Sequence, residues 1–228
     1  MMKKYTTLLF DVDGTLLDFS DAQKQALKNT FQNYHLSLTK DIEERYTIIN
    51  DELWKQFEKG IIDKKTVIYT RFVQLFKEFN IKEDGVAFEN DYQIELGKSH
   101  KKLPFAREVL ETLSQDYNLY VVTNGVAQTQ YSRLKESGLH IYFQDIFISE
   151  NIGYQKPRKE YFDYCFQKIP FFQLHKTLII GDSLSSDIQG GINAGIDTCF
   201  ICSDIPKIDD IKPTYIIQNL KDIYKILK

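Results

Sequence analysis

The chain has 228 residues, of which 43% are hydrophobic and 27% charged, as in a globular protein with one large domain or one domain plus an insertion. Its formal net charge of −3 argues against a non-specific binder of nucleic-acid polymers, but leaves small anionic substrates open. No apolar run approaches the ~20 residues of a membrane span, and the first one is too short for the core of a signal peptide. We therefore expect a cytoplasmic protein that binds no membrane.

Six short apolar segments are predicted to be strands of a parallel sheet, because strands buried on both faces are hydrophobic throughout. Segments with a helical spacing of apolar residues lie between most of them, and this alternation favours an α/β doubly wound fold. The predicted strands are Thr6–Phe10, Leu119–Val122, Ile146–Ser149, Thr177–Gly181, Thr198–Cys202 and Tyr215–Ile217. The predicted helices between them include Phe105–Ser114, Gln128–Ser137, Glu160–Lys168 and Ser186–Ala194.

The region from Asp18 to Ser99 interrupts this alternation, because it carries helical patterns and no predicted strand. We therefore expect residues 1–17 and 100–228 to form an α/β core, with residues 18–99 as a helical domain inserted after the first strand. The inserted region is rich in aromatic residues, which we interpret mainly as its core. One or two of them could instead face a ligand. The aromatic residues in question are Phe31, Tyr34, Tyr46, Trp54, Phe57, Tyr69, Phe72 and Phe76.

The three cysteines do not form a recognisable metal or redox site. Cys199 and Cys202 match C-x-x-C, but residues three apart on a predicted strand point to opposite faces of the sheet. A redox C-x-x-C normally lies at the N-terminus of a helix. We therefore interpret these residues and Cys165 as buried, reduced thiols, and the four histidines show no metal-ligand spacing either.

Polar residues follow several predicted strands, at the end of the sheet where ligands bind in open parallel folds. Asp11 and Asp13 come directly after the first strand, and Thr123–Gly125 after the second. Lys156 lies between the third and fourth strands, and Gly181–Asp187 follows the fourth. We expect these segments to bring carboxylates, a hydroxyl and an ammonium group to one edge.

This combination of groups suits phosphoryl transfer. A carboxylate such as Asp11 can attack phosphorus and form an aspartyl-phosphate. Anionic partners need a hard cation between them, and Mg²⁺ prefers oxygen ligands of the kind that Asp11 and Asp182 offer. Lys156, Thr123 and the backbone amides after it could stabilise the phosphoryl oxygens. Asp13 could protonate the leaving alkoxide and then deprotonate water.

The chain resembles phosphatases of the haloacid dehalogenase (HAD) superfamily, whose motifs are D-x-D-G-T, S/T, K and G-D-x(4)-D. Here the motifs occur in that order as residues 11–15, Thr123, Lys156 and residues 181–187. The resemblance covers essentially the whole chain. It implies a HAD-like Rossmannoid core with a parallel sheet between helices, plus an inserted all-helical type 1 cap that closes over the substrate.

The resemblance also implies roles for the motif residues. Asp11 would be the nucleophile and Asp13 the acid/base. Mg²⁺ would bind the Asp11 side chain, the Asp13 backbone carbonyl and Asp182, while Asp187 would support the metal indirectly or through water. Alternatively, Asp187 could be the N-cap of a helix. The residues expected to bind phosphate are Thr123, Asn124 and Lys156.

Asp13 and the acidic fourth motif favour phosphate chemistry over dehalogenation, because the loss of halide needs neither a proton nor magnesium. The segments "FDVDGTLLDF", "VVTNGVAQTQYSRLKESGL", "KPRKEYFDY" and "GDSLSSDIQGGINAGIDTCF" are similar to the YjjG-type pyrimidine 5′-nucleotidases. This resemblance implies a magnesium-dependent hydrolase of (deoxy)pyrimidine nucleoside monophosphates. A sugar-phosphate phosphatase similar to the N-acylneuraminate-9-phosphatases remains an alternative. So does a catalytically idle binding or regulatory protein, although the intact motif set argues against it.

Overall fold

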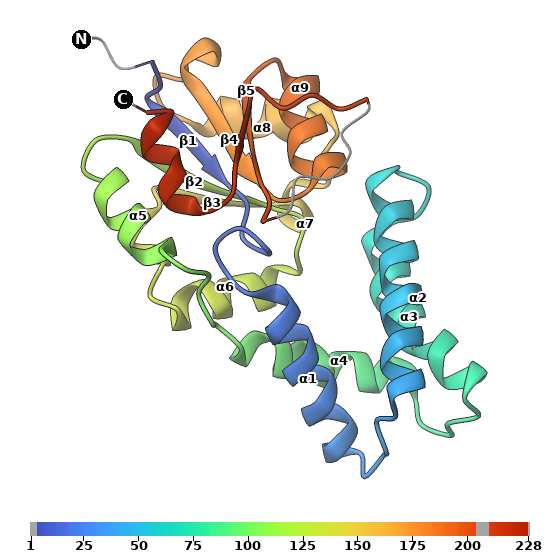
Figure 1. Cartoon of the computed structure of the whole chain (residues 1–228). Helices are drawn as coiled ribbons and strands as arrows, with labels where there is room; N and C mark the ends of the chain where they lie inside the picture. The colour runs from blue at the N-terminus through green and yellow to red at the C-terminus, as the bar shows by residue number, and fades with distance from the viewer. Residues whose placement is uncertain (1–3, 204–209, 228) are drawn as a thin grey trace. The chain divides into compact units, whose positions relative to one another are not determined.

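The computed structural model describes residues 4–203 and 210–227 of the chain (Figure 1). These residues fall into two compact units. One unit contains the chain up to Phe19 and from His100 onward, and the other is Ser20–Ser99.

The first unit is built on a sheet of six parallel strands in the order β3-β2-β1-β4-β5-β6. Its central strand β1 pairs with β2 on one side and β4 on the other, so that Leu8 lies beside Leu119 and Leu178. The prediction of an α/β fold with a parallel sheet is therefore confirmed. The strands are β1 (Thr7–Phe10), β2 (Asn118–Thr123), β3 (Asp145–Ile148), β4 (Thr177–Gly181), β5 (Asp197–Ile201) and β6 (Tyr215–Ile217).

Helices cover both faces of this sheet, and β1 shows why. Its side chains alternate in direction, so Leu8 and Phe10 enter one hydrophobic cluster and Leu9 the other. Helix α5 and the C-terminal 3₁₀ turn pack in the first cluster, and α8 and α9 in the second (Figure 1). The helices of this unit are α5 (Ala106–Leu113), α6 (Ala127–Glu136), α7 (Ser149–Ile152), α8 (Lys159–Lys168) and α9 (Gln189–Ala194), with 3₁₀ turns at His140–Tyr142, Leu174–Lys176 and Leu220–Lys225.

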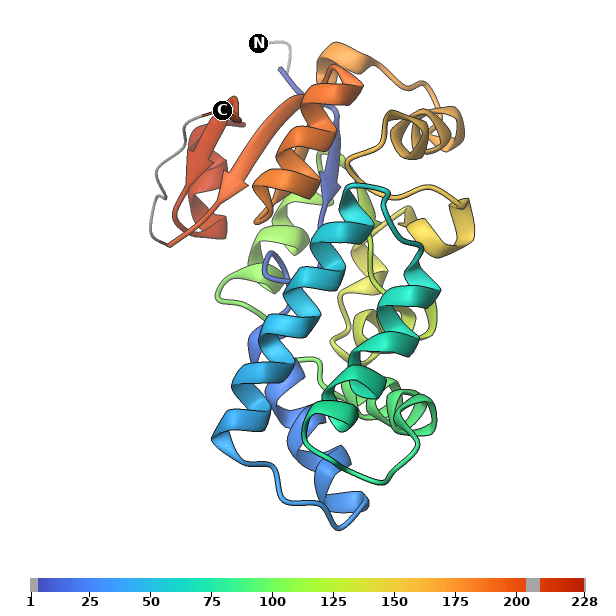
Figure 2. The ribbon, with the colours of Figure 1, turned by 90° about the vertical axis from the view of Figure 1, so that its right-hand side faces the viewer.

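The second unit is helical, and its described residues, 20–99, contain no strand. Helix α3 packs between α2 and α4 (Figure 2). Three helices begin at a side-chain cap: Thr39, Asp63 and Asp84 each accept a hydrogen bond from a backbone N–H of the next turn. The helices are α1 (Phe19–Asn33), which starts in the first unit, α2 (Lys40–Glu58), α3 (Lys64–Glu78) and α4 (Gly85–Lys98).

A buried ion pair lies within the aromatic core of the helical unit. Arg71 donates two hydrogen bonds of 2.7 Å to the Glu89 carboxylate and a third of 2.7 Å to Asn50 Oδ1. Its guanidinium also lies 4.9 Å from the ring centre of Tyr92. The side chains of Arg71 and Glu89 are only 2% and 0% exposed, so their charges are matched and shielded from water.

Two of the three cysteines agree with the expectation of buried, free thiols. Cys165 and Cys199 are buried, and burial raises the pKa of the Cys199 thiol to about 12. Cys202 is also not in a disulfide with a described residue, but it is partly exposed and lies one residue beyond the end of β5.

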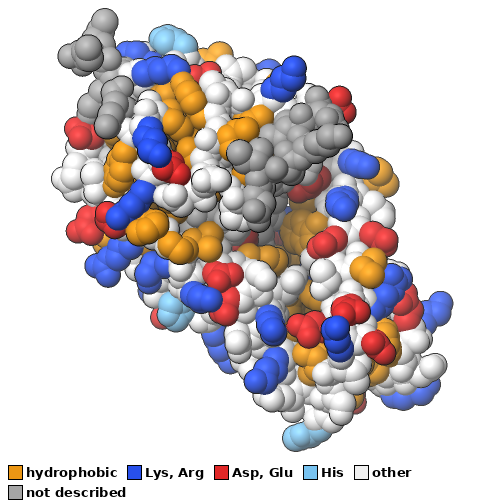
Figure 3. All heavy atoms as spheres, in the orientation of Figure 1, with side chains coloured by type: hydrophobic (Ala, Val, Ile, Leu, Met, Phe, Trp, Pro, Cys, Tyr) orange, Lys and Arg blue, Asp and Glu red, His pale blue; other side chains and the backbone are white. Residues whose placement is uncertain are grey.

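The surface carries charges of both signs. On the face shown in Figure 3, the described Lys and Arg side chains are interspersed with Asp and Glu, as the small net charge of −3 would suggest. Among the described residues, no helix combines the length and the hydrophobicity that a membrane crossing would require.

Candidate active site

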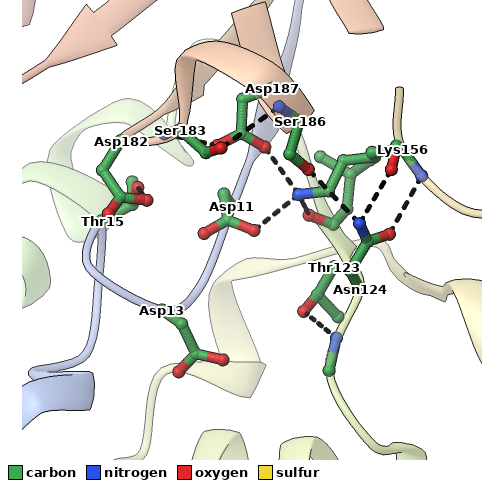
Figure 4. Close-up of polar contacts among 12 residues, drawn as sticks. Asp11, Asp13, Thr15, Thr123, Asn124, Lys156, Asp182, Ser183, Ser186 and Asp187 are labelled. Carbon is green, nitrogen blue, oxygen red and sulfur yellow. Dashed lines mark hydrogen bonds and ion pairs between the residues drawn. The ribbon is translucent and has the colours of Figure 1, made fainter. Parts of the chain in front are cut away.

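The predicted site residues lie at the carboxyl ends of the three central strands of the sheet (Figure 4). Asp11 follows β1, Thr123 is the last residue of β2, and Asp182 follows β4. Because β2 and β4 flank β1, these three ends adjoin. Lys156 comes from the loop after α7, and Asp187 from a π-helical turn, Leu184–Ile188, that precedes α9.

Lys156 is the buried cation at the centre of this site. Its Nζ donates to Asp11 Oδ1 at 2.6 Å, to Asp187 Oδ1 at 2.6 Å and to the Val122 carbonyl at 2.8 Å, which uses all three of its protons. The side chain is 1% exposed. Burial alone would lower the pKa of Lys156, but Asp11 and Asp187 raise it above its usual value, so the group remains an ammonium.

Three carboxylates gather around this cation in a way that fits a metal ion. Asp11, Asp182 and Asp187 can each offer one oxygen, and these oxygens lie within 4.8 Å of one another. Burial raises the pKa of Asp11 well above its usual range, against the opposing effect of Lys156, and the neighbouring carboxylates raise it further. Asp182 keeps an exposed edge, but protein surrounds most of it, and this burial together with Asp187 raises its pKa to about 7.

The formal charges at this edge do not cancel. Four carboxylates, with Asp13 as the fourth, face two cations, Lys156 and Arg133, which leaves a formal charge of −2. A divalent cation would neutralise it, and the all-oxygen donor set is the one that Mg²⁺ prefers. The donor chemistry therefore fits the predicted Mg²⁺ cofactor.

Two glycines make room for these carboxylates. Gly14 has a φ of +77°, and a Cβ there would lie 2.0 Å from Asp182 Oδ2. At Gly181, a Cβ would lie 2.2 Å from Asp187 Oδ2. A side chain at either position would displace a carboxylate, which explains why a glycine follows Asp13 in one motif and precedes Asp182 in another.

The Asn124 side chain connects three loops of the site through hydrogen bonds. Its Oδ1 accepts from the Lys156 backbone N–H at 2.9 Å, and its Nδ2 donates to the Lys156 carbonyl at 2.9 Å and to Ser186 Oγ at 3.3 Å (Figure 4). Asn124 is one of the residues predicted from the sequence to bind phosphate. In the structure its side chain holds the backbone of Lys156, so a phosphate contact would have to come from its backbone N–H.

The Thr123 hydroxyl accepts two hydrogen bonds, which leaves its proton available for donation. Its Oγ1 accepts from the Gly125 backbone N–H at 3.0 Å and from Gln130 Nε2 at 3.3 Å. Because both contacts use lone pairs of the oxygen, the hydroxyl proton can be donated to a substrate oxygen.

Asp187 is not simply the helix cap that its position allowed. Ser183 Oγ accepts the capping hydrogen bond, from Ser186 N at 3.1 Å. Asp187 instead binds Lys156 through Oδ1 and accepts from the Ser183 backbone N–H through Oδ2, at 3.1 Å. It therefore fixes Lys156 against the loop that carries Asp182.

The Asp13 carboxylate points away from the cluster of Asp11 and Lys156 (Figure 4). It is held by two side chains of α6, Gln130 and Arg133, which sequence analysis did not single out. The available signal was weak: two long polar residues three positions apart lie on one face of a helix, but such pairs are common on solvated faces.

Comparison with known proteins places the chain in one family. The family model for haloacid dehalogenase-like hydrolases matches residues 8–201. The chain is 47% identical over 227 residues to the HAD-hydrolase YfnB of Bacillus subtilis, covering 99% of this chain and 97% of that one. The crystal structure of YfnB bound to magnesium is similar to this structure with a TM-score of 0.94, covering 99% of this chain and 100% of that one.

Two further relatives match at lower identity. Pyrimidine 5′-nucleotidase PynA of Streptococcus pneumoniae is 38% identical over 225 residues, covering 98% of this chain and 95% of PynA. Pyrimidine 5′-nucleotidase YjjG of Escherichia coli is 29% identical over 227 residues, covering 98% of both chains. The predicted superfamily and the prediction of an enzyme are confirmed by these matches, and a magnesium cofactor agrees with the YfnB structure. The chain belongs to the haloacid dehalogenase-like hydrolase family.

Proposed function

We propose that this enzyme is a Mg²⁺-dependent phosphomonoester hydrolase that acts through an aspartyl-phosphate on Asp11, with pyrimidine nucleoside 5′-monophosphates as substrates. The observation that carries the proposal is the charge of the site. A buried carboxylate, Asp11, is held by a lysine at an edge with a formal charge of −2 and only oxygen donors for a metal. Such a site favours a divalent cation and a phosphoryl group together.

In the first step, an Asp11 oxygen attacks phosphorus and the bond between phosphorus and the ester oxygen breaks. Lys156 orients the carboxylate through Oδ1. The Thr123 hydroxyl and the backbone N–H groups after it stabilise charge on the phosphoryl oxygens. Asp13 gives its proton to the departing alkoxide.

In the second step, Asp13 takes a proton from water, and the water oxygen attacks the phosphorus of the aspartyl-phosphate. The bond between phosphorus and Asp11 breaks, which releases inorganic phosphate, frees the Asp11 carboxylate and leaves Asp13 protonated for the next cycle. Asp11, Asp182 and the Asp13 backbone carbonyl would hold Mg²⁺, with Asp187 supporting them. Bound there, the metal would supply positive charge that offsets the negative charge of the phosphoryl oxygens.

The choice of pyrimidine nucleotides rests on the relatives and on the helical unit. PynA and YjjG, both matched over nearly their whole length, are pyrimidine 5′-nucleotidases. The residues at the sheet edge contact only the phosphoryl group that all phosphomonoesters share, so selectivity must come from elsewhere. We assign it to residues 18–99, acting as a lid on a core formed by residues 1–17 and 100–228.

Within this proposed lid, few aromatic rings remain available to a base. Phe31, Tyr46, Phe57, Phe72 and Phe76 are buried in its core. Tyr69 is 44% exposed, and Tyr34 and Trp54 are partly exposed, so these three are the candidates for stacking. Stacking is worth about 1–3 kcal/mol for any base, so the preference for pyrimidines would come from size exclusion.

The test is a comparison of kcat/KM for a set of phosphomonoesters in Mg²⁺. We expect dUMP and dTMP to exceed UMP, dAMP and dGMP, and all of them to exceed glucose 6-phosphate, phosphoglycolate and N-acetylneuraminate 9-phosphate. A sugar phosphate that wins by tenfold or more would refute the nucleotidase assignment and leave the chemistry at Asp11 in place. Release of phosphate from none of them would refute the phosphatase itself.

A further inference from the structure

Helix α6 presents two buried side chains to the Asp13 carboxylate. Arg133 Nη1 donates to Asp13 Oδ1, and Gln130 Nε2 donates to Asp13 Oδ2 at 2.5 Å. Gln130 and Arg133 are three positions apart, so they lie on one face of the helix, and both residues are 1% exposed. Each oxygen of the carboxylate is therefore held by a different residue of α6.

The two residues are themselves fixed by other parts of the site. The Arg133 guanidinium lies 5.7 Å from the ring centre of Phe19. Gln130 Nε2 also donates to Thr123 Oγ1 at 3.3 Å, so its amide connects Asp13 to the hydroxyl at the end of β2. Gly125 leaves the space for this contact, because a Cβ there would lie 2.1 Å from Gln130 Nε2.

The orientation of the Gln130 amide has a cost in stability. If the amide were flipped, its oxygen would face the Asp13 carboxylate, so the N–H groups must point toward Asp13. Among the described residues, the buried Gln130 Oε1 then has no hydrogen-bond partner. Leaving a buried acceptor unsatisfied is unfavourable, and leucine would fill a similar volume without it. Packing alone therefore does not explain a glutamine at this position.

We propose that Gln130 and Arg133 are positioning residues that hold the Asp13 carboxylate where it can exchange a proton with the leaving oxygen and with water. This inference rests on the phosphatase function proposed above. In an in-line displacement the leaving oxygen is on the side of phosphorus opposite the nucleophile. A carboxylate that points away from Asp11 and is 25% exposed suits that position.

If the two side chains position Asp13, their removal should slow the chemical step most for substrates whose leaving group must be protonated. A displacement of a reacting group by about 1 Å can cost ~10²-fold in rate. p-Nitrophenolate leaves without protonation, whereas the alkoxide of a nucleoside needs it. Loss of either donor should thus reduce the turnover of dUMP far more than that of p-nitrophenyl phosphate.

The experiment compares Arg133→Met and Gln130→Leu with wild type on these two substrates, with Asp13→Asn as the reference for a lost acid. We expect kcat for dUMP to fall by about 10–100-fold in both variants, and kcat for p-nitrophenyl phosphate by less than about threefold. In Arg133→Met, KM and the Mg²⁺ concentration for half-maximal activity should stay within about twofold of wild type, because Arg133 acts on the Asp13 carboxylate. Gln130→Leu also removes the hydrogen bond to Thr123 Oγ1, so for this variant the comparison of kcat between the two substrates is the readout.

The matched controls are Arg107→Met on α5 and Gln128→Leu on α6, which change the same residue types at exposed positions and should leave both activities unchanged. A structural role would not respond to added guanidinium. We expect millimolar guanidinium to restore part of the dUMP turnover of Arg133→Ala, and to leave Gln130→Leu unchanged.

Equal losses on both substrates in the two variants, or unchanged turnover of dUMP, would overturn the positioning role while the phosphatase function stands. If Arg133→Met does not fold, Gln130→Leu decides the question, because it keeps the buried cation. If wild type hydrolyses neither phosphomonoester, the proposed function fails, and the role of α6 fails with it.

Discussion

Each unit of this enzyme has an almost completely buried cation that contacts a carboxylate, Arg71 in the helical unit and Lys156 in the α/β unit, and the two have different surroundings. In the helical unit, Arg71 is matched by a single carboxylate, Glu89, and Asn50 accepts a third hydrogen bond from it. In the α/β unit, Lys156 is in contact with two carboxylates, Asp11 and Asp187, and further carboxylates lie close by.

The contrast indicates which cluster supports the fold and which supports chemistry. A buried ion pair with matched charges leaves no excess charge, and it is strongly destabilised only when one partner is removed. A buried group with an excess of one charge is unstable by itself, and its strongly shifted pKa values are typical of functional sites. The cluster at Lys156 therefore favours a bound cation, or protons on its carboxylates in the absence of one, whereas the charges of Arg71 and Glu89 cancel.

The largest expected difference between the two clusters is that only the cluster at Lys156 affects turnover. We expect Asp11→Asn to reduce kcat at least ~10⁴-fold, as removal of a nucleophile does in other enzymes. The amide keeps the shape and can still accept from Lys156, so the variant should fold and melt no lower than metal-free wild type. Colorimetric phosphate release and a thermal melt of the purified variant measure both effects. A folded variant with substantial activity would contradict the role of Asp11.

Removal of the metal should have the next largest effect. We expect EDTA treatment to abolish activity, Mg²⁺ to restore it, and Ca²⁺ to support it poorly, because its looser coordination misplaces Asp11. Mg²⁺ should also raise the melting temperature of wild type, since it binds only the folded state. The same titration of Asp182→Asn should give a much smaller shift. Full activity after complete removal of metal would contradict the account of the charge excess.

Removing a single charge from the helical unit should lower its free energy of unfolding. Glu89→Gln leaves Arg71 buried without its counter-charge, which typically costs about 3–5 kcal/mol in the free energy of unfolding. The matched control is Glu78→Gln, which removes the carboxylate from the Arg45–Glu78 pair, whose side chains are 33% and 34% exposed. Surface pairs of this kind contribute about 0–1 kcal/mol. Urea denaturation of both variants measures the difference, and equal costs would show that the Arg71 cluster is not special.

The smallest effect concerns the pH dependence of the metal-free protein. Because the folded-state pKa of Asp182 is about 7, above its usual value of 3.8, the folded state binds the proton more tightly than the unfolded state. Stability without metal should therefore fall as the pH rises from about 4 to 7, and Asp182→Asn should weaken this fall. Melting temperatures in EDTA at several pH values test this. If the melting temperature of wild type falls with pH no more steeply than that of Asp182→Asn, the proposed excess of negative charge at the site would be contradicted.

The sequence allowed much of the α/β unit to be predicted, because strands buried on both faces leave a clear signal. The predicted bounds of Thr177–Gly181 and Tyr215–Ile217 equal those of β4 and β6. The helix predicted at Ser186–Ala194 is only in part an α-helix: α9 begins at Gln189, after the π-helical turn that lets Asp187 reach Lys156. Asp187 in that turn contacts Lys156, which is 31 positions away in the chain, and no local pattern reveals such a contact.

The residues of the candidate site were likewise predictable only in part. Asp11, Lys156 and Asp182 could be placed at one edge, because residues after parallel strands meet there. The contacts that Gln130 and Arg133 make with Asp13, and that the Asn124 side chain makes with Lys156, could not be predicted. Each depends on the direction in which one side chain points. A helical repeat does not say which polar residues of α6 face inward.

The most direct test of the account is whether Asp11 carries the phosphoryl group during turnover. Wild-type enzyme in Mg²⁺ is mixed with its best substrate labelled at phosphorus, quenched with acid within one turnover, and digested for mass spectrometry. We predict a labelled peptide with the phosphoryl group on Asp11, absent from Asp11→Asn. Release of labelled phosphate at the full rate, with no label on Asp11 at any time, would show that water attacks the substrate directly and would contradict the account.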